Sequence, residues 1–164
     1  NMTKIGVLSD THLTKPDKAF AAMIERHYED ADLIVHAGDM VTLSVLDPIF
    51  SLGVEVAAVC GNMDHADVQR AYPVSRTIRV EDMRIGIIHG WGSVSGIRSR
   101  IRASFKDDPD IIIYGHTHQA YSADEAGVFF FNPGSPTDSR FTSDCSVGII
   151  VIDKNTIRGE IIPV

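Results

Sequence analysis

The sequence predicts an α/β fold in which two mixed β-sheets pack face to face, with helices on the outside. In the first half, short apolar runs rich in β-formers alternate with helical patterns, as in parallel strands joined by helical crossovers. In the second half, such runs come in pairs around short turns, which indicates hairpins. A chain of 164 residues suits one domain, which at this size buries roughly 70% of its unfolded surface. We therefore expect residues 1–164 to form a single domain.

The elements of the first half are marked by periodicity and by residues typical of helix ends. Pro16 suits the first turn of a helix, and Gly53 suits the position just after a helix ends. Strands are predicted at residues 4–9, 32–36 and 54–60, and helices at residues 16–29 and 43–52.

The second half contains two predicted hairpins. Residues 76–80 and 84–89 flank Glu81-Asp82, and residues 147–152 and 156–162 flank the turn at 153–155. Between the hairpins, apolar residues recur every four positions and mark one face of a helix, at Ile97, Ile101 and Phe105. An apolar run at 111–114 follows this helix and predicts a buried strand.

Composition narrows the class of protein. The formal net charge of -7 disfavours a nucleic-acid scaffold, because such binding needs a concentrated positive surface. Only two cysteines occur, Cys60 and Cys145, and both lie in or beside apolar runs, so we expect no disulfide framework. No stretch reaches the length of a membrane span and no basic-then-apolar leader precedes Lys4, so we expect a cytoplasmic protein without a membrane partner. Asn1 ahead of Met2 suggests a tag remnant.

Five apolar runs each end in a polar residue that is able to bind a metal ion. The carboxyl ends of strands in α/β sheets form the binding edge, so we expect these side chains to converge. The run ends carry Asp10-Thr11-His12, Asp39, Asn62, His89 and His116-Thr117-His118.

Seven nitrogen and oxygen ligands exceed the needs of one tetrahedral zinc ion but suit two ions that share a carboxylate. We predict Asp39 as the shared carboxylate, with Asn62 as a neutral oxygen ligand. Each residue also has a simpler explanation: Asp and Asn after Gly are common in turns and helix caps, and His89 alone suits a satisfied core histidine. The joint occurrence at five strand ends favours the metal site over these explanations.

These residues resemble the motifs of a known family. The motifs Asp10-x-His12, Gly38-Asp39, Gly61-Asn62, His89-Gly90 and Gly115-His116-x-His118 resemble, in order, those of the calcineurin-like metallophosphoesterases. The resemblance spans nearly the whole chain and is strongest to the small bacterial and archaeal single-domain phosphodiesterases. It implies a four-layer α/β/β/α sandwich of two mixed sheets flanked by helices.

The resemblance also implies roles for the ligands. One ion would be held by Asp10, His12 and His118, the other by Asn62, His89 and His116, with Asp39 as the bridge. Both would be divalent, with manganese as the first expectation and iron, zinc, nickel or cobalt as alternatives. The implied reaction is hydrolysis of a small phosphate ester, a diester in preference to a monoester, by in-line attack of a hydroxide that bridges the ions.

Two departures from the family pattern concern the residues around the substrate. Many members carry a His directly after the Asn, able to protonate the leaving group, whereas this chain has Met63, then Asp64 and His65. Asp64 is a candidate general acid, although a cap on a helix at Ala66–Ala71 is favoured over that role. Trp91 replaces a frequent second His after His89-Gly90; a packed lid residue is the favoured interpretation, and a platform for a leaving-group ring or base is the alternative.

Further candidates follow the run at 128–131. Asn132-Pro133-Gly134-Ser135 resembles a turn near the metal site in this branch. Arg140 is a candidate for gripping a phosphate oxygen, with a surface arginine as the equal alternative.

Two other functions compete with the hydrolase. One is a non-catalytic interaction scaffold of the same fold, like the retromer subunit that resembles these enzymes but has an eroded site. The other is a nuclease-like enzyme, and the acidic balance and the lack of a long basic stripe count against it. Because every ligand position is filled, we expect catalysis. Exposed strand edges and the habit of the family are compatible with a homodimer.

Overall fold

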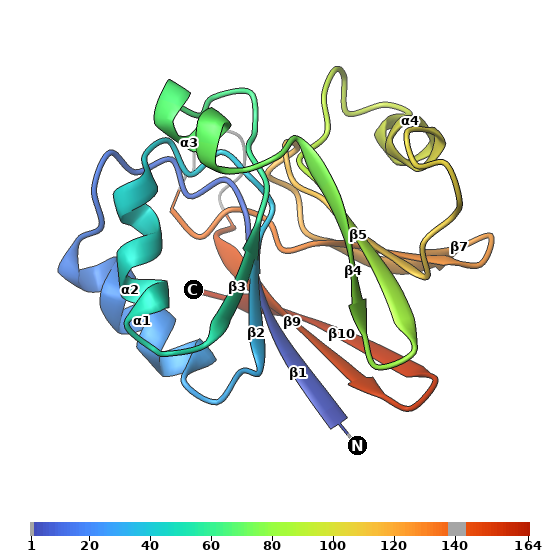
Figure 1. The fold of residues 1–164 in the computed structure, drawn as a ribbon, viewed down its shortest axis with the longest axis horizontal. Coiled ribbons are helices and arrows are strands. Elements are labelled where there is room, and N and C mark those ends of the chain that lie inside the picture. Colours follow the sequence, from blue (N-terminus) through green and yellow to red (C-terminus); the bar gives the residue numbers. More distant parts are fainter. Residues whose placement is uncertain (1, 138–143) are drawn as a thin grey trace.

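The computed structural model describes residues 2–137 and 144–164. They form two five-stranded mixed sheets, with the strand orders β10-β9-β1-β2-β3 and β4-β5-β6-β8-β7 (Figure 1). The strands of the first sheet are β1 (Met2–Leu8), β2 (Leu33–His36), β3 (Glu55–Ala58), β9 (Ser146–Asp153) and β10 (Thr156–Pro163). Those of the second are β4 (Ser75–Val80), β5 (Met83–Ile88), β6 (Ile111–Ile113), β7 (Tyr121–Glu125) and β8 (Val128–Asn132).

Helices cover the outer face of each sheet. On the first sheet lie α1 (Lys18–Tyr28) and α2 (Asp47–Phe50), which follows the 3-10 helix η1 (Leu43–Leu46) (Figure 1). The helix α4 (Ile97–Ala103) packs on the second sheet, and α3 (Ala66–Ala71) lies after β3. The helix α1 begins where the Asp17 side chain accepts a hydrogen bond from the Phe20 amide at 2.8 Å, which satisfies one free donor of the first turn.

Three apolar clusters separate the four layers. Side chains such as Ile5, Val35 and Ile85 fill the space between the two sheets. A second cluster, with Ile24 and Ile49, joins the first sheet to α1 and α2, and a third joins α4 to the second sheet. The predicted α/β sandwich of two mixed sheets flanked by helices is confirmed.

Some elements differ from the sequence-based expectation. The single helix predicted at 43–52 is split, because Pro48 has no amide hydrogen and cannot donate to the Ser44 carbonyl, while the Asp47 amide bonds Ser44 with 3-10 spacing. The polar strand β7 was not predicted; it pairs with β8 along one edge of the sheet. The second half also contains parallel pairs in addition to the predicted hairpins: β5 pairs in parallel with β6, and β6 with β8.

Two findings bear on composition. Cys60 and Cys145 are both free thiols. Within residues 2–137 and 144–164, no helix is both long enough and apolar enough to cross a membrane.

Candidate metal centre

The strand ends bring the predicted ligands to one end of the molecule. The chain passes Asp10 after β1, Asp39 after β2, His89 directly after β5, and His116 and His118 after β6. Within each sheet these strands are parallel to one another, so their carboxyl ends share an edge. In Figure 1 this is the end near α3 and the loop that leads to α4.

Five of the seven predicted ligands form two groups whose ligand atoms lie within 4.8 Å of one another. The first group is Asp10, His12 and His118, and the second is Asp10, Asp39 and His89. The Asp10 Oδ1 atom lies 3.3 Å from His118 Nε2 and 3.6 Å from His12 Nε2. The Asp39 Oδ2 atom lies 3.0 Å from His89 Nε2 and 3.7 Å from His12 Nε2, so Asp39 reaches histidines of both groups.

Each carboxylate is anchored by one oxygen and directs the other into the cluster. Asp10 Oδ2 accepts hydrogen bonds from Ser9 Oγ at 2.7 Å and from the His116 amide at 3.1 Å. Asp39 Oδ1 accepts from the Met63 amide at 2.8 Å. The remaining oxygens, Oδ1 of Asp10 and Oδ2 of Asp39, face the histidines. Each carboxylate is therefore held in a fixed orientation by one oxygen, and its other oxygen is directed to where a metal ion would bind.

Two buried atoms of the cluster suit a cation. Asp10 Oδ1 and His89 Nε2 make no hydrogen bond within the part of the chain that the structure describes. Buried polar atoms are otherwise almost always paired, because desolvation without a partner is costly. Carboxylate and imidazole groups are ligands of divalent metals, so this donor set fits such ions.

Hydrogen bonds to carbonyl groups orient two of the histidines. His89 Nδ1 lies 2.9 Å from the Ala37 carbonyl, which only accepts, so Nδ1 carries the proton and Nε2 faces the carboxylates. His116 Nε2 lies 2.8 Å from the Gly92 carbonyl in the same way, which leaves Nδ1 as the ring nitrogen that is able to bind a metal ion. The His116 ring lies edge-on to the His89 ring, with 5.4 Å between their centroids.

The charges of the cluster shift the pKa values of its members. Burial alone would raise the pKa of Asp10, but the adjacent His118 and His12 and the charge of His89 lower it well below its ordinary value. Burial alone would lower the pKa of His89, but Asp39 and Asp10 raise it to about 9. The carboxylates thus stabilise positive charge at this position, which a divalent ion supplies in place of a proton.

The backbone at the ligands is unusual. Asp10, His12, Asp39, His116 and His118 all have positive φ, between 44° and 71°. Non-glycine residues seldom adopt this region, and it costs of order 1–3 kcal/mol each. Such conformations concentrate at functional sites, where the surrounding structure holds them.

Comparison with known proteins identifies the family. Residues 3–155 match the model of the calcineurin-like phosphoesterase superfamily domain. The chain belongs to this family. A probable metallophosphoesterase of Methanothermobacter thermautotrophicus is 37% identical, over 96% of this chain and 91% of its own. A phosphodiesterase of Methanocaldococcus jannaschii is 29% identical over 94% of this chain and 96% of its own. Among solved structures, Vps29 of Entamoeba histolytica in complex with zinc has a TM-score of 0.75 at 20% identity, covering 98% of this chain and 99% of its own, which shows a shared fold.

Buried polar side chains brace the ligand loops of this calcineurin-like phosphoesterase. His36 Nδ1 accepts from the Gly38 amide at 3.1 Å, so Nε2 carries the proton and donates to Thr11 Oγ1, also at 3.1 Å. Burial lowers the pKa of His36 to about 4, which keeps it neutral. The Ser135 hydroxyl donates to the Asp10 carbonyl at 2.7 Å, so the predicted turn at 132–135 does lie beside the metal site.

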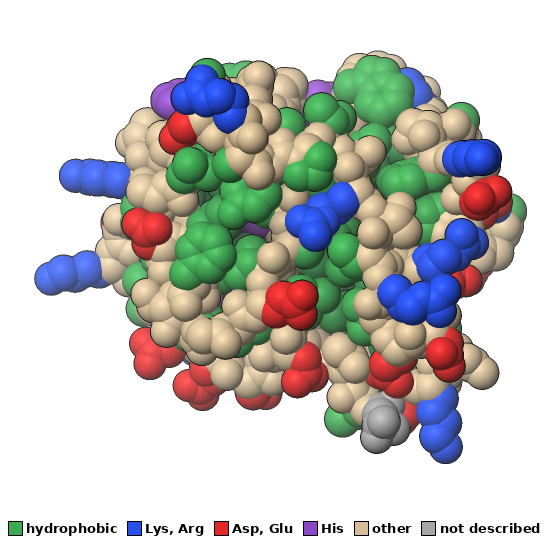
Figure 2. Space-filling view, in the orientation of Figure 1, with side chains coloured by type: hydrophobic (Ala, Val, Ile, Leu, Met, Phe, Trp, Pro, Cys, Tyr) green, Lys and Arg blue, Asp and Glu red, His purple; other side chains and the backbone are tan. Residues whose placement is uncertain are grey.

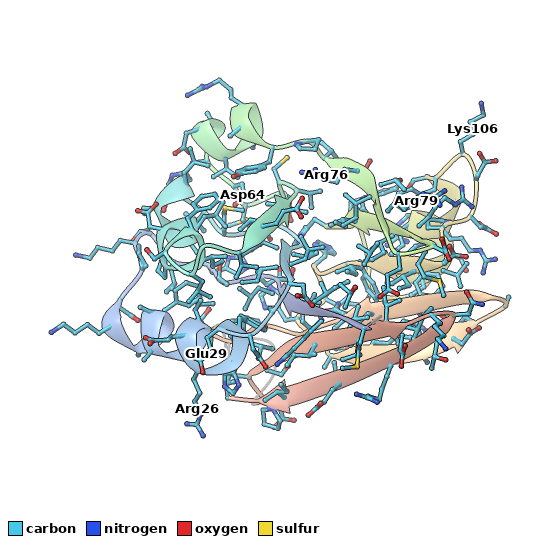
Figure 3. All side chains as sticks on the ribbon, turned by 60° about the horizontal axis from the view of Figure 1, so that its bottom comes forward. Arg26, Glu29, Asp64, Arg76, Arg79 and Lys106 are labelled. Atoms are coloured by element: carbon cyan, nitrogen blue, oxygen red, sulfur yellow. The ribbon has the colours of Figure 1, made fainter. Side chains whose placement is uncertain are left out.

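Asp64 has a different place from the one predicted. The helix α3 has His65 at its N-cap without a side-chain cap, so the prediction that Asp64 caps it is wrong. Asp64 is 5% exposed, and its carboxylate accepts three backbone amides: Gly61 and Val41, both at 2.6 Å, and Asp39 at 3.0 Å. Figure 3 shows Asp64 among the layers of the fold, whereas Arg26 and Lys106 extend into solvent. Both oxygens are committed to these amides, so Asp64 joins the loops after β2 and β3, and the geometry gives no support to a general acid here.

The other predicted residues lie around the two groups or outside the described residues. Asn62 is exposed and lines a cavity together with His89. His116 is half-buried and belongs to neither group. Trp91 is 46% exposed and lines the same cavity, so it is not a packed lid residue. Arg140 lies outside the described residues.

Sequence reasoning missed the residues that brace the ligands. Ser9 stands directly before the predicted ligand Asp10 but carries no motif of its own, and Gly115 belongs to the motif Gly115-His116-x-His118 without a role assigned to it. A Cβ at Gly115 would lie 1.9 Å from Ser9 Oγ and 2.6 Å from Asp10 Oδ2, so only glycine leaves room for this contact. The signal that was available was the position of Gly115 directly before His116.

Proposed function

We propose that this chain is a phosphodiesterase that holds two divalent metal ions. His12 and His118 would hold one, Asn62, His89 and His116 the other, with Asp10 on the first and Asp39 shared between them. The observation that carries this proposal is the pair of ligand groups around Asp10 Oδ1 and Asp39 Oδ2. The relative named phosphodiesterase supports a diester substrate.

The chain's own residues do three things in this proposal. Asp10 and Asp39 present one fixed oxygen each, because Ser9 and the amides of His116 and Met63 hold the other. His89 is oriented by the Ala37 carbonyl, so its Nε2 needs no rearrangement to bind. Divalent ions at these positions would supply positive charge for the phosphate oxygens and make water a stronger nucleophile.

The leaving group receives its proton from a source that the described residues do not define. Met63 has no acidic hydrogen, and the Asp64 oxygens are engaged by amides. Esters with good leaving groups need least protonation. We therefore expect a strong dependence of the rate on the basicity of the leaving group.

The test is turnover of bis(p-nitrophenyl) phosphate against p-nitrophenyl phosphate, with protein of measured metal content. We expect the diester to be hydrolysed faster, and Asp39→Asn and His89→Ala to lose most turnover, because each removes a ligand atom from the cluster. Asp67→Asn, on the surface side of α3, is the matched control and should retain activity. Wild-type rates in the two ligand variants would refute the assignment.

The scaffold function remains the second candidate. The shared fold with Vps29 is the observation in its favour. Protein that binds no manganese, zinc or cobalt and hydrolyses neither ester would support the scaffold and contradict the enzyme.

Further predictions accompany this proposal. Manganese is the proposed native metal, and the cytoplasm the proposed compartment. A small phosphate ester remains the proposed substrate in preference to nucleic acid, since the net charge is -7. A homodimer through an exposed strand edge is testable by light scattering.

A further inference from the structure

A cavity of about 480 Å³ opens beside the metal cluster. His89 and Asn62 form its wall on the side of the metal site, and Cys60, Val74, Ile88 and Trp91 supply apolar surface. No Lys, Arg, Asp or Glu lines it among the residues that the structure describes. Its volume and its apolar wall with few polar groups are typical of small-molecule sites.

Two exposed apolar side chains flank the cavity. Trp91 is 46% exposed and Val74 is 68% exposed, although both are large hydrophobic groups. Figure 2 shows hydrophobic side chains exposed near the loop before α4 and others near α3, with other surface between them. Contiguous exposed apolar surface that is rimmed by polar groups is typical of ligand-binding grooves.

The backbone fixes the position of the tryptophan. Gly90 and Gly92, on either side of Trp91, have φ of +97° and +82°, a region that other residues rarely adopt. The chain therefore turns on both sides of the indole. The Gly92 carbonyl also contacts His116 Nε2 at 2.8 Å, which links this loop to a proposed metal ligand.

Arg100 holds the same loop from α4. Its guanidinium donates to the carbonyls of Trp91 at 2.6 and 3.0 Å and of Ser93 at 2.6 Å. The Arg100 guanidinium carbon also lies 5.9 Å from the centre of the Trp91 ring. With a longer bond to the Ser95 carbonyl at 3.5 Å, four hydrogen bonds from one side chain keep the loop in place, so the apolar wall is formed before a ligand arrives.

We propose that this cavity binds a planar aromatic substituent of the phosphodiester substrate, with Trp91 as the stacking surface and Arg100 as the residue that positions it. The proposal rests on the proposed function for the place of the phosphate, at the Asp10 and His89 cluster. The described residues that line the cavity include no charged side chain, so we expect the substituent to be uncharged. An aromatic ring that stacks on tryptophan contributes binding free energy beyond that of its buried area, and an aliphatic group lacks this contribution.

Trp91 is the single tryptophan of the chain, so its fluorescence reports on this site directly. The manganese-loaded protein is titrated with diphenyl phosphate and with dimethyl phosphate, which both lack a good leaving group. We expect diphenyl phosphate to change the Trp91 emission and dimethyl phosphate to leave it unchanged. Equal effects of the two ligands, or no effect of diphenyl phosphate, would overturn the proposal.

Variants test the roles of the two residues by calorimetry, which does not need turnover. Trp91→Ala should weaken diphenyl phosphate binding roughly ten-fold or more, as stacking energies imply, and Trp91→Phe should restore most of it. Arg100→Met should weaken it about three-fold or more, since hydrogen bonds to the loop are lost. Arg98→Met is the matched control on the same helix, because Arg98 pairs with Glu125 and packs on Tyr121 instead. Trp91→Ala with unchanged affinity would overturn the stacking role, and equal losses in Arg98→Met and Arg100→Met would overturn the positioning role.

The two proposals fail in different ways. Phenyl p-nitrophenyl phosphate and methyl p-nitrophenyl phosphate share one leaving group and differ in the retained substituent. Their hydrolysis rates are therefore compared. Turnover of both esters without any preference for aromatic ligands in binding would leave the phosphodiesterase standing and remove the aromatic site. Selective binding of diphenyl phosphate without hydrolysis of any ester would support the aromatic site and contradict the enzyme.

Discussion

Replacement of Asp64 by Asn probes how the ligand loops are held together. The Asp64 carboxylate accepts amide hydrogens of Gly61, Val41 and Asp39, so it ties the loop after β2 to the loop after β3. An Asn side chain has one acceptor oxygen in place of two. In its better orientation this oxygen keeps the Gly61 and Asp39 amides, and its NH2 group faces the Val41 amide.

The magnitude follows from the three hydrogen bonds. The Val41 amide loses its acceptor and meets a donor, which costs about 1–3 kcal/mol. The two remaining bonds lose the charge of their acceptor, at about 1 kcal/mol each. Because Asp64 is 5% exposed, water replaces little of this, and we expect the free energy of unfolding to fall by about 3–5 kcal/mol. A wild type with a free energy of unfolding near the middle of the usual range of about 5–15 kcal/mol would leave the variant folded.

Urea denaturation of the chelator-treated protein measures this loss, and competition with a chromophoric chelator measures manganese affinity. We expect a ten-fold or greater loss of affinity, because residues that orient metal ligands typically contribute roughly that much. Asp67→Asn is the control, since within the described residues the Asp67 side chain accepts a hydrogen bond from the amide of Val68, its neighbour in α3, and from no other group. If Asp64→Asn unfolds within about 1 kcal/mol of the wild type and binds manganese equally well, the bracing role is refuted.

Three further predictions concern the same end of the molecule. Gly115→Ala should abolish tight manganese binding by calorimetry, because its Cβ would lie 1.9 Å from Ser9 Oγ. Gly53→Ala is the control: its φ of +72° strains the backbone, but its Cβ meets nothing within 4 Å, so manganese binding should persist. Tight binding by Gly115→Ala would contradict the packing argument. His36 has a pKa of about 4 in the fold against an ordinary 6.5, so the unfolded chain takes up a proton first as the pH falls. Between pH 6.5 and 4, the free energy of unfolding of the wild type should therefore fall by about 3 kcal/mol relative to that of His36→Gln, with no relative loss above pH 6.5. Unfolding free energies that change in parallel with pH in the two proteins would refute this. Manganese at a hundred times its Kd should stabilise the wild type by about 2.7 kcal/mol and Asp10→Asn by much less, as measured by thermal unfolding; equal gains would exclude Asp10 as a ligand.

Much of the fold could be predicted from local patterns. Strands such as β1 and β5 are apolar runs with sharp polar ends, so their positions and their ligand residues are visible in the sequence. The order of the strands within each sheet and the pairing of β6 with β8 could not be predicted, because strand pairing depends on contacts between residues far apart in the chain. The polar strand β7 has no apolar signal and forms through its backbone bonds to β8.

The family motifs and the types of ligand can be read from the sequence alone, because a metal site requires particular donor atoms at strand ends. How those residues contact one another depends on the packing of the folded chain. The neighbours of Asp64 in the chain predict a helix cap, yet two of its three amide partners, Asp39 and Val41, are more than twenty residues away. Trp91 and Arg100 likewise lie on separate elements and meet only in the fold. Side-chain roles that depend on distant backbone groups leave no local pattern, since the free energy of such contacts arises only when the layers pack.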